Sequence, residues 1–117
     1  GATVAAVLVL TSIPTFTNAG SPAPLNRTGT AHPKDYDVYT VRFRAGEMAR
    51  VWVTNLTSNA DLDVRVIDPL TLQVVAQDNR VNRDASVQFF PPRGGEYIIV
   101  IHNFSGARGA QYRVSTN

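Results

Sequence analysis

The strongest constraint on the fold is a period-two pattern of apolar residues, which is clearest in Gly94–Val114. Every second residue from Tyr97 to Ile101 is apolar, and Tyr112 and Val114 repeat the pattern after a short break. Alternation at this period is typical of strands that bury one face. The break between the two runs contains Asn, Ser and Gly, which are common turn residues. The stretch therefore predicts a β-hairpin.

The same alternation occurs in five earlier runs, and turn residues or prolines separate each run from the next. These runs are Asp35–Phe43, Ala49–Asn55, Asp61–Asp68, Leu72–Ala76 and Ala85–Phe89. No stretch has the apolar spacing of an amphipathic helix. About seven short strands without helices predict an all-β fold, an antiparallel β-sandwich.

The N-terminal segment 1–12 contains an uncharged apolar stretch, Thr3–Leu10. It is rich in β-branched residues, which favour strands over helices. Because it is apolar on both faces, both faces need a cover. It is either a buried first strand of its own sandwich, a strand donated to a neighbouring subunit, or a signal remnant or irregular tail. The residues expected to make the assembly contact are Thr3, Val4, Val7, Leu8, Val9 and Leu10.

Residues 13–33 have the composition of a linker. Four prolines alternate there with Ser, Thr, Asn and Gly, and such segments tend to be extended. Twenty-odd residues at about 3 Å each reach tens of ångströms. That length is enough to carry Thr3–Leu10 into another molecule. The globular domain is predicted to span residues 34–117.

Composition excludes several classes of function. The net charge is only +2 and the arginines are dispersed among carboxylates, so nucleic-acid binding is not expected. The chain has no cysteine, which removes thiol chemistry and disulfides. No apolar stretch is long enough to span a bilayer. Gly1 is interpreted as a mature N-terminus left after removal of a signal peptide, which predicts an extracellular or cell-surface protein.

Four residues are predicted to contribute to surface contacts. Ile98 and Val100 occupy the second face of their strand, and Trp52 lies opposite the inward residues of its own strand. Either a loop or the linker covers them, or they form a docking patch. Tyr36 and Trp52 are the aromatic residues expected to be exposed, where they could stack on sugars.

Three carboxylates, Asp61, Asp63 and Asp78, are candidate oxygen ligands for calcium. The alternative is a solvated outer face on which Arg65 pairs with these acids. No other cofactor is expected. The zinc motif HExxH and the nucleophile motif GxSxG are both absent, so the chain is not expected to be an enzyme.

Asn26, Asn55 and Asn103 each begin an Asn-x-Ser/Thr sequon. Such sequons indicate surface loops and carry glycans only where the source has the machinery.

Three segments, taken together, resemble the bacterial pre-peptidase C-terminal domain family. They are Asp35–Gly46, Ala60–Pro69 and Gly95–Val114, which look like the family's opening strand and turn, its D-L-D strand and its closing G-x-Y hairpin. The resemblance covers roughly residues 34 to 115. It implies a jelly-roll-like β-sandwich, secretion and no catalysis. Related collagen-binding modules are similar in shape, and some bind calcium.

The sequence thus favours a secreted structural subunit that assembles with copies of itself into an extracellular filament or surface layer. Donation of Thr3–Leu10 to the next subunit would supply main-chain hydrogen bonds and fill apolar pockets. The alternative is an accessory module of a secreted protein that binds polysaccharide or a matrix protein.

Overall fold

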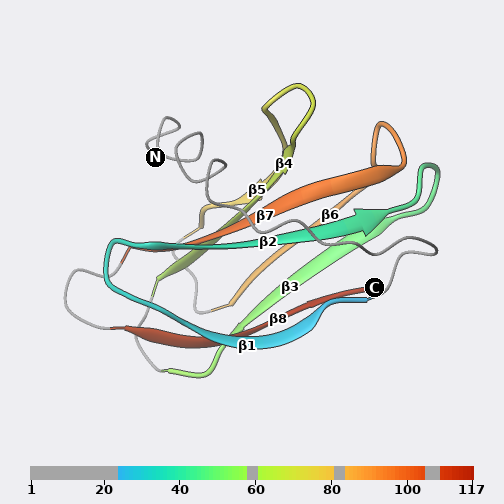
Figure 1. The fold of residues 1–117 in the computed structure, drawn as a ribbon. Coiled ribbons are helices and arrows are strands. Elements are labelled where there is room, and N and C mark those ends of the chain that lie inside the picture. The colour runs from blue at the N-terminus through green and yellow to red at the C-terminus, as the bar shows by residue number, and fades with distance from the viewer. Residues whose placement is uncertain (1–23, 58–60, 81–83, 105–108) are drawn as a thin grey trace.

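The computed structural model describes residues 24–57, 61–80, 84–104 and 109–117, and all of their regular structure is β (Figure 1). The strands are β1 (Asn26–Ala31), β2 (Tyr36–Phe43), β3 (Ala49–Asn55), β4 (Leu62–Asp68), β5 (Gln73–Asp78), β6 (Ala85–Phe89), β7 (Gly95–Asn103) and β8 (Ala110–Thr116). Every pairing is antiparallel. The predicted all-β fold is confirmed, with eight described strands instead of about seven.

The strands form two four-stranded sheets that lie face to face (Figure 1). Sheet A has the order β1-β8-β3-β6, and sheet B has the order β2-β7-β4-β5. Apart from the β4–β5 hairpin, each strand is followed by a strand of the other sheet. This exchange between sheets produces the predicted sandwich. The predicted β-hairpin at Gly94–Val114 is wrong, because β7 belongs to sheet B and β8 to sheet A, so the two strands pair with other strands and not with each other.

The main core lies between the sheets and contains the residues predicted to point inward. Tyr97 and Ile99 from sheet B and Val53 and Val114 from sheet A have no exposed surface. Each fully buried aliphatic or aromatic side chain stabilises the fold by about 1.5–3 kcal/mol, so this shared interior holds the two sheets together.

The prediction that all of residues 13–33 form a linker is wrong, because β1 lies within this range and pairs with β8 along its whole length. Its sequence, NRTGTA, has no apolar alternation because its inward residues include Gly29 and Ala31. A Cβ atom at Gly29 would lie 2.6 Å from the Tyr112 hydroxyl. A large inward side chain is excluded there, so the usual signal for a strand is missing.

A polar cluster of Asp37, Tyr39 and Tyr112 lies next to Gly29, between β2 and β8. The Tyr112 hydroxyl donates to Asp37 Oδ2 at 2.5 Å and lies 2.6 Å from the Tyr39 hydroxyl. Burial raises the pKa of Asp37, and the hydrogen bond from Tyr112 opposes that rise. The cluster ties β2 of sheet B to β8 of sheet A.

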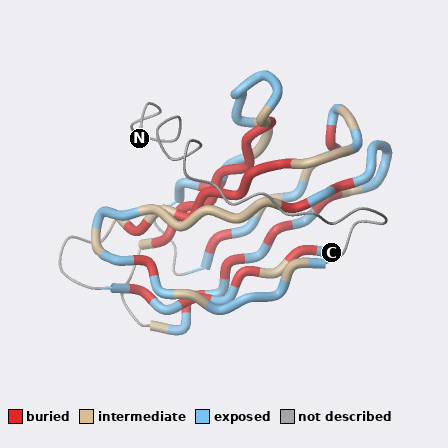
Figure 2. The backbone as a smooth tube through the Cα atoms, viewed as in Figure 1, coloured by how far each residue is buried: buried red, intermediate tan, exposed pale blue. Residues whose placement is uncertain are grey.

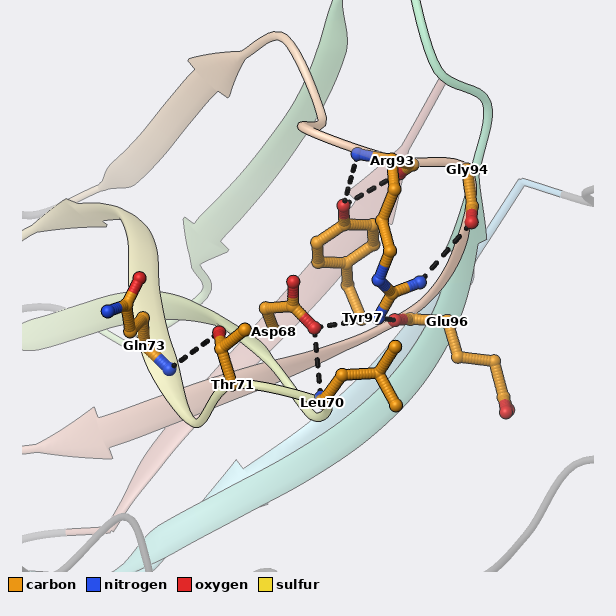
Figure 3. Close-up of polar contacts among 8 residues, drawn as sticks. All are labelled: Asp68, Leu70, Thr71, Gln73, Arg93, Gly94, Glu96 and Tyr97. Carbon is orange, nitrogen blue, oxygen red and sulfur yellow. Dashed lines mark hydrogen bonds and ion pairs between the residues drawn. The ribbon is translucent and has the colours of Figure 1, made fainter.

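Arg93 makes a second set of contacts, near the end of β2 opposite to Asp37. Figure 3 shows these contacts. Its Nη2 atom lies 2.6 Å from Asp68 Oδ1, and its guanidinium lies 5.2 Å from the centre of the Tyr97 ring. The Tyr97 hydroxyl donates to the Arg93 carbonyl at 2.7 Å. Asp68 Oδ1 also accepts the Leu70 amide at 2.9 Å, so Arg93 links the β4–β5 turn to the β6–β7 turn.

Candidate binding surfaces

The outer face of sheet A is polar and open. Along β3, Arg50, Trp52 and Thr54 are exposed and alternate with buried residues, and β8 alternates in the same way (Figure 2). The outward positions on the neighbouring strands are also polar. They are Asn26, Thr28 and Thr30 on β1, Ser86 and Gln88 on β6, and Gln111, Arg113 and Ser115 on β8.

Trp52 lies in the middle of this face, with 41% of its surface exposed. The strand register places it between Ser115 on β8 and Ser86 on β6. Arg50 follows two residues away on the same face of β3, and Arg113 lies in the next row of β8. The prediction that Trp52 points away from the core is confirmed by its exposure.

The outer face of sheet B has a covered apolar cluster at its centre. Ile67, Ile98 and Val100 form a second cluster there, separate from the main core, and they are only 2%, 5% and 1% exposed. Tyr36 and Val38 pack against this cluster. Ile98 and Val100 are therefore not an open docking patch, and the alternative in which their face is covered is the one consistent with the structure.

Tyr36 is half-buried and stacks on His102, with ring centroids 4.2 Å apart and an interplanar angle of 8°. Tyr36, Ile98 and Val100 thus belong to one face of sheet B, whereas Trp52 lies on the outer face of the other sheet. The four residues predicted as surface contacts do not form one surface.

Two buried charged residues, Asp63 and Arg65, alternate with the core residues of β4 and so point to the covered face. Burial, together with the negative charge of Asp61, raises the pKa of Asp63 to about 6. Arg65 opposes the rise by favouring the ionised carboxylate. The solvated outer face that was the alternative to calcium binding is wrong at these two positions, because both side chains are buried.

Asp78, the third predicted calcium ligand, already forms hydrogen bonds and an ion pair with other residues. Its carboxylate accepts two hydrogen bonds from the Arg80 side chain, at 2.9 and 2.8 Å, and one from the Ser86 amide at 3.0 Å. The Arg80 side chain is the main reason that the pKa of Asp78 falls to about 2. In the described part of the chain, no group of three or more His, Cys, Asp or Glu residues could hold a metal ion.

The residues predicted to form the assembly strand, Thr3, Val4 and Val7–Leu10, lie outside the described residues, as do 1–12 and most of the predicted linker. Two features of the described chain bear on them. Leu25 is anchored to the end of β8, since its amide donates to Thr116 Oγ1 at 2.8 Å. Within the described ranges, β2 pairs with β7 alone, so its other edge has no described strand beside it.

Residues 35–103, more than half of the chain, match the sequence profile of the bacterial pre-peptidase C-terminal domain. The chain belongs to this family. Such PPC domains are non-catalytic accessory modules that occur in secreted bacterial proteins. No curated protein sequence matches the chain. The described residues contain no helix that is long and apolar enough to span a membrane.

Three solved structures are similar to this PPC domain. The pre-peptidase C-terminal domain of the collagenase from Bacillus anthracis has a TM-score of 0.66 at 15% identity, and the likeness covers 80% of this chain and 88% of that one. The Yersinia pseudotuberculosis-derived mitogen has a TM-score of 0.62 at 14% identity, over 83% and 86%. Aeromonas hydrophila PliG, a periplasmic inhibitor of g-type lysozyme, has a TM-score of 0.55 at 17% identity, over 88% and 90%. Identities this low show a shared fold alone.

The PPC fold buries two of the three sequon asparagines. Asn103 has no exposed surface, and its Nδ2 atom donates to the Ala31 carbonyl at 3.0 Å. Asn55 is 3% exposed, and its Oδ1 atom accepts the Thr57 amide at 2.8 Å. The prediction that these two sequons mark surface loops is wrong, because both side chains bond the backbone at strand ends. Only Asn26 has an exposed side chain suited to modification.

Arg50 and Arg113 are the surface residues that the sequence reasoning missed. Both alternate with core residues, so the period-two pattern already placed them outward. That they flank Trp52 depends on the β3–β8 pairing, which brings together segments about sixty residues apart in sequence.

Proposed function

We propose that this PPC chain is a secreted, non-catalytic structural subunit. It assembles head to tail by placing Thr3–Leu10, in the next copy, along the edge of β2 that has no described strand beside it. Family membership supports the non-catalytic and secreted character. What we propose in addition is the binding partner, a second copy of the same chain.

The observation that carries the proposal is that β2 has apolar side chains on both faces of sheet B, with Thr40 and Arg42 as the polar positions of its outer face. Val41 faces the main core, while Tyr36 and Val38 contact the second cluster on the outer face. A strand added beside β2 would meet apolar surface on both sides. Thr3–Leu10 is apolar on both faces and is eight residues long, which is the length of β2.

The other three sheet edges fit this segment less well. β1 and β6 belong to sheet A, whose outer face is polar, so half of an added apolar strand would be exposed to water. β5 lies in sheet B but is mostly exposed, with 43% of Val74 accessible. Apolar surface on both sides is therefore greatest beside β2.

The tether is long enough for exchange between molecules. Residues 11–24 separate the segment from the anchored Leu25, and fourteen extended residues reach about 45 Å. Burial of four or five Val and Leu side chains would contribute roughly 6–15 kcal/mol before ordering costs. Head-to-tail contacts of this kind form filaments when the rotation between copies does not close a ring.

Deletion of residues 1–12 tests the proposal. We expect the shortened protein to lose its high-mass species in light scattering while keeping its β-sheet circular dichroism. Addition of a synthetic peptide of residues 1–12 should raise its melting temperature by occupying the vacant edge. A full-length protein that is monomeric at all concentrations would refute the assembly.

Engineered cysteines identify the receiving molecule, since the chain has no cysteine of its own. Thr40→Cys on β2 is combined with Val7→Cys or with Leu8→Cys, because adjacent strand residues point to opposite faces. Oxidation should produce a covalent ladder that reducing agent dissolves. A cross-linked monomer would instead place the segment beside β2 of its own chain.

The second candidate is a binding module for polysaccharide or matrix protein. It is supported by the exposure of Trp52 in a polar sheet face, where packing does not require an indole ring.

A further inference from the structure

We infer that the outer face of sheet A binds an acidic polysaccharide, meaning a linear polymer of sugars that carry carboxylate groups. The inference specifies the ligand class of the binding alternative. It does not depend on self-assembly, because the surface lies on the opposite side of the sandwich from the second cluster of sheet B.

The face is a regular array of short polar side chains around one indole ring. Ser115, Trp52 and Ser86 form one row across β8, β3 and β6, and Arg113 and Thr54 belong to the next row. Rows of outward residues are about 7 Å apart along a strand, and neighbouring strands are about 5 Å apart. An extended polymer can lie on such a surface and contact several rows.

The ring of Trp52 provides the apolar part of the site. An indole face accepts the C–H side of a sugar ring, while hydroxyl and amide side chains around it bond the sugar hydroxyls. Among the outward positions on the four described strands of sheet A, Trp52 is the single aromatic residue, so a sugar ring that stacks on this face stacks there. Residues 26–31 extend the polar surface on β1, where the outward side chains are Asn26, Thr28 and Thr30.

Charge selects an acidic polymer over a neutral one. Arg50 and Arg113 flank Trp52, and no carboxylate occupies an outward position on the four described strands of sheet A. Asp84 is the acid that directly precedes β6 in sequence. Its carboxylate accepts a hydrogen bond from the Asn55 amide at 2.8 Å. Guanidinium groups bind carboxylates in a two-pronged geometry. Neither arginine has an ion pair among the described residues, so two arginines beside a stacking platform fit a uronate polymer.

A depression of about 420 Å³ continues the face beyond Arg113. It is lined by Thr28, Gly29, Thr30, Leu56, Gln111 and Tyr112. Its threonine and glutamine side chains supply hydrogen-bonding groups. The proposed site therefore combines the Trp52 ring, the guanidinium groups of Arg50 and Arg113, and a recess that could hold a further sugar unit.

Single-stranded nucleic acid also combines stacking with negative charge, but its binding depends on many phosphate contacts along a basic groove. Two arginines on an otherwise neutral face supply few such contacts. A short oligothymidylate is accordingly included in the test as a competing ligand.

The test uses the fluorescence of Trp52, the single tryptophan of the chain, as a reporter of this face. The full-length protein is titrated with polygalacturonate, with the same polymer after methyl esterification, and with the oligothymidylate. We expect polygalacturonate to change the emission in a saturable, salt-sensitive manner, and the uncharged ester to bind at least tenfold more weakly.

Arg50→Gln and Arg113→Gln keep the reporter and should each weaken binding by about tenfold, the effect of losing one charge-assisted contact. Arg42→Gln is the matched control. It removes the same charge from sheet B, where Arg42 is paired in register with Glu96. It should leave the affinity within twofold. Trp52→Ala, measured by co-sedimentation, should abolish retention, and melting curves confirm that each variant is folded.

Equal affinity for the neutral ester, an equal loss in Arg42→Gln, or preferential binding of oligothymidylate would each overturn the inference. So would an emission that does not change with polygalacturonate. The protein without residues 1–12 separates the two proposals: it should be unable to assemble and still bind the polymer. Loss of binding together with assembly would show that the site requires the polymerised form and would contradict a site complete on sheet A.

Discussion

Gly29 lies where the fold has no room for a side chain. A Cβ atom there would lie 2.6 Å from the Tyr112 hydroxyl and 2.9 Å from the Tyr39 hydroxyl. Gly29→Ala should therefore push β1 off β8 or break the hydrogen bond to Asp37. We expect a loss of about 1–3 kcal/mol in the free energy of unfolding, measured with urea.

The control for Gly29→Ala is Thr28→Ala, which changes the outward neighbour on the same strand. It should cost less than about 0.5 kcal/mol, as exposed substitutions do. Equal effects of the two substitutions would contradict the close approach of Tyr112 to β1.

Asp63 should make stability depend on pH. Its pKa is about 6 in the folded protein and 3.8 in the unfolded chain, so the folded state holds the proton more tightly between these values. The free energy of unfolding then falls as pH rises from about 4 to about 6 and does not change further from this group. Asp63→Asn should remove that fall, which is on the order of 1 kcal/mol once solvent screening is included.

Melting temperatures of the wild type and of Asp63→Asn, measured from pH 4 to pH 7, check this expectation. The variant should gain stability relative to the wild type as pH rises. Parallel curves would show that Asp63 titrates near its ordinary pKa and that its site on β4 is open to water.

At the scale of elements, the two turns joined by Arg93 should be coupled. Arg93→Ala removes the ion pair with Asp68 and the contact with the Tyr97 ring. We expect faster amide exchange at Leu70, in the β4–β5 turn, and at Tyr97 on β7, with no change along β1 and β8. The Leu70 amide is sensitive because its acceptor, Asp68, would move once unpaired.

Arg44→Ala is the matched control for Arg93→Ala. Its ion pair with Glu47 is 3.9 Å long and joins two exposed side chains, so its loss should leave exchange and melting temperature nearly unchanged. Unchanged exchange in Arg93→Ala as well would mean that each turn is held by its own hairpin.

At the scale of the whole molecule, the two outer faces are chemically different. Sheet A presents a polar face with one indole ring, and sheet B presents a face whose centre is a buried apolar cluster. If Thr3–Leu10 joins the edge of β2, the polar faces of successive subunits remain accessible. A filament of this kind would display repeated copies of the sheet A face, and weak sites gain avidity when they are repeated.

The sequence alone was sufficient for the class of fold and most of its strands. Period-two alternation identified every described strand except β1, because the inward side chains of the others are apolar. It also placed Trp52 outward. These properties depend on local order along the chain, since a strand turns each successive side chain to the opposite face.

Tertiary structure decided where those faces meet. Strand β1 could be recognised only from its pairing with β8, where Gly29 lies against Tyr112. A strand of small and polar residues has no apolar alternation that would predict it. The covering of Ile98 and Val100, the burial of Asn103, and the pairing that puts Arg113 near Trp52 all join residues distant in sequence. Burial and neighbourhood depend on which strands lie side by side, and alternation along one strand carries no information about its neighbours.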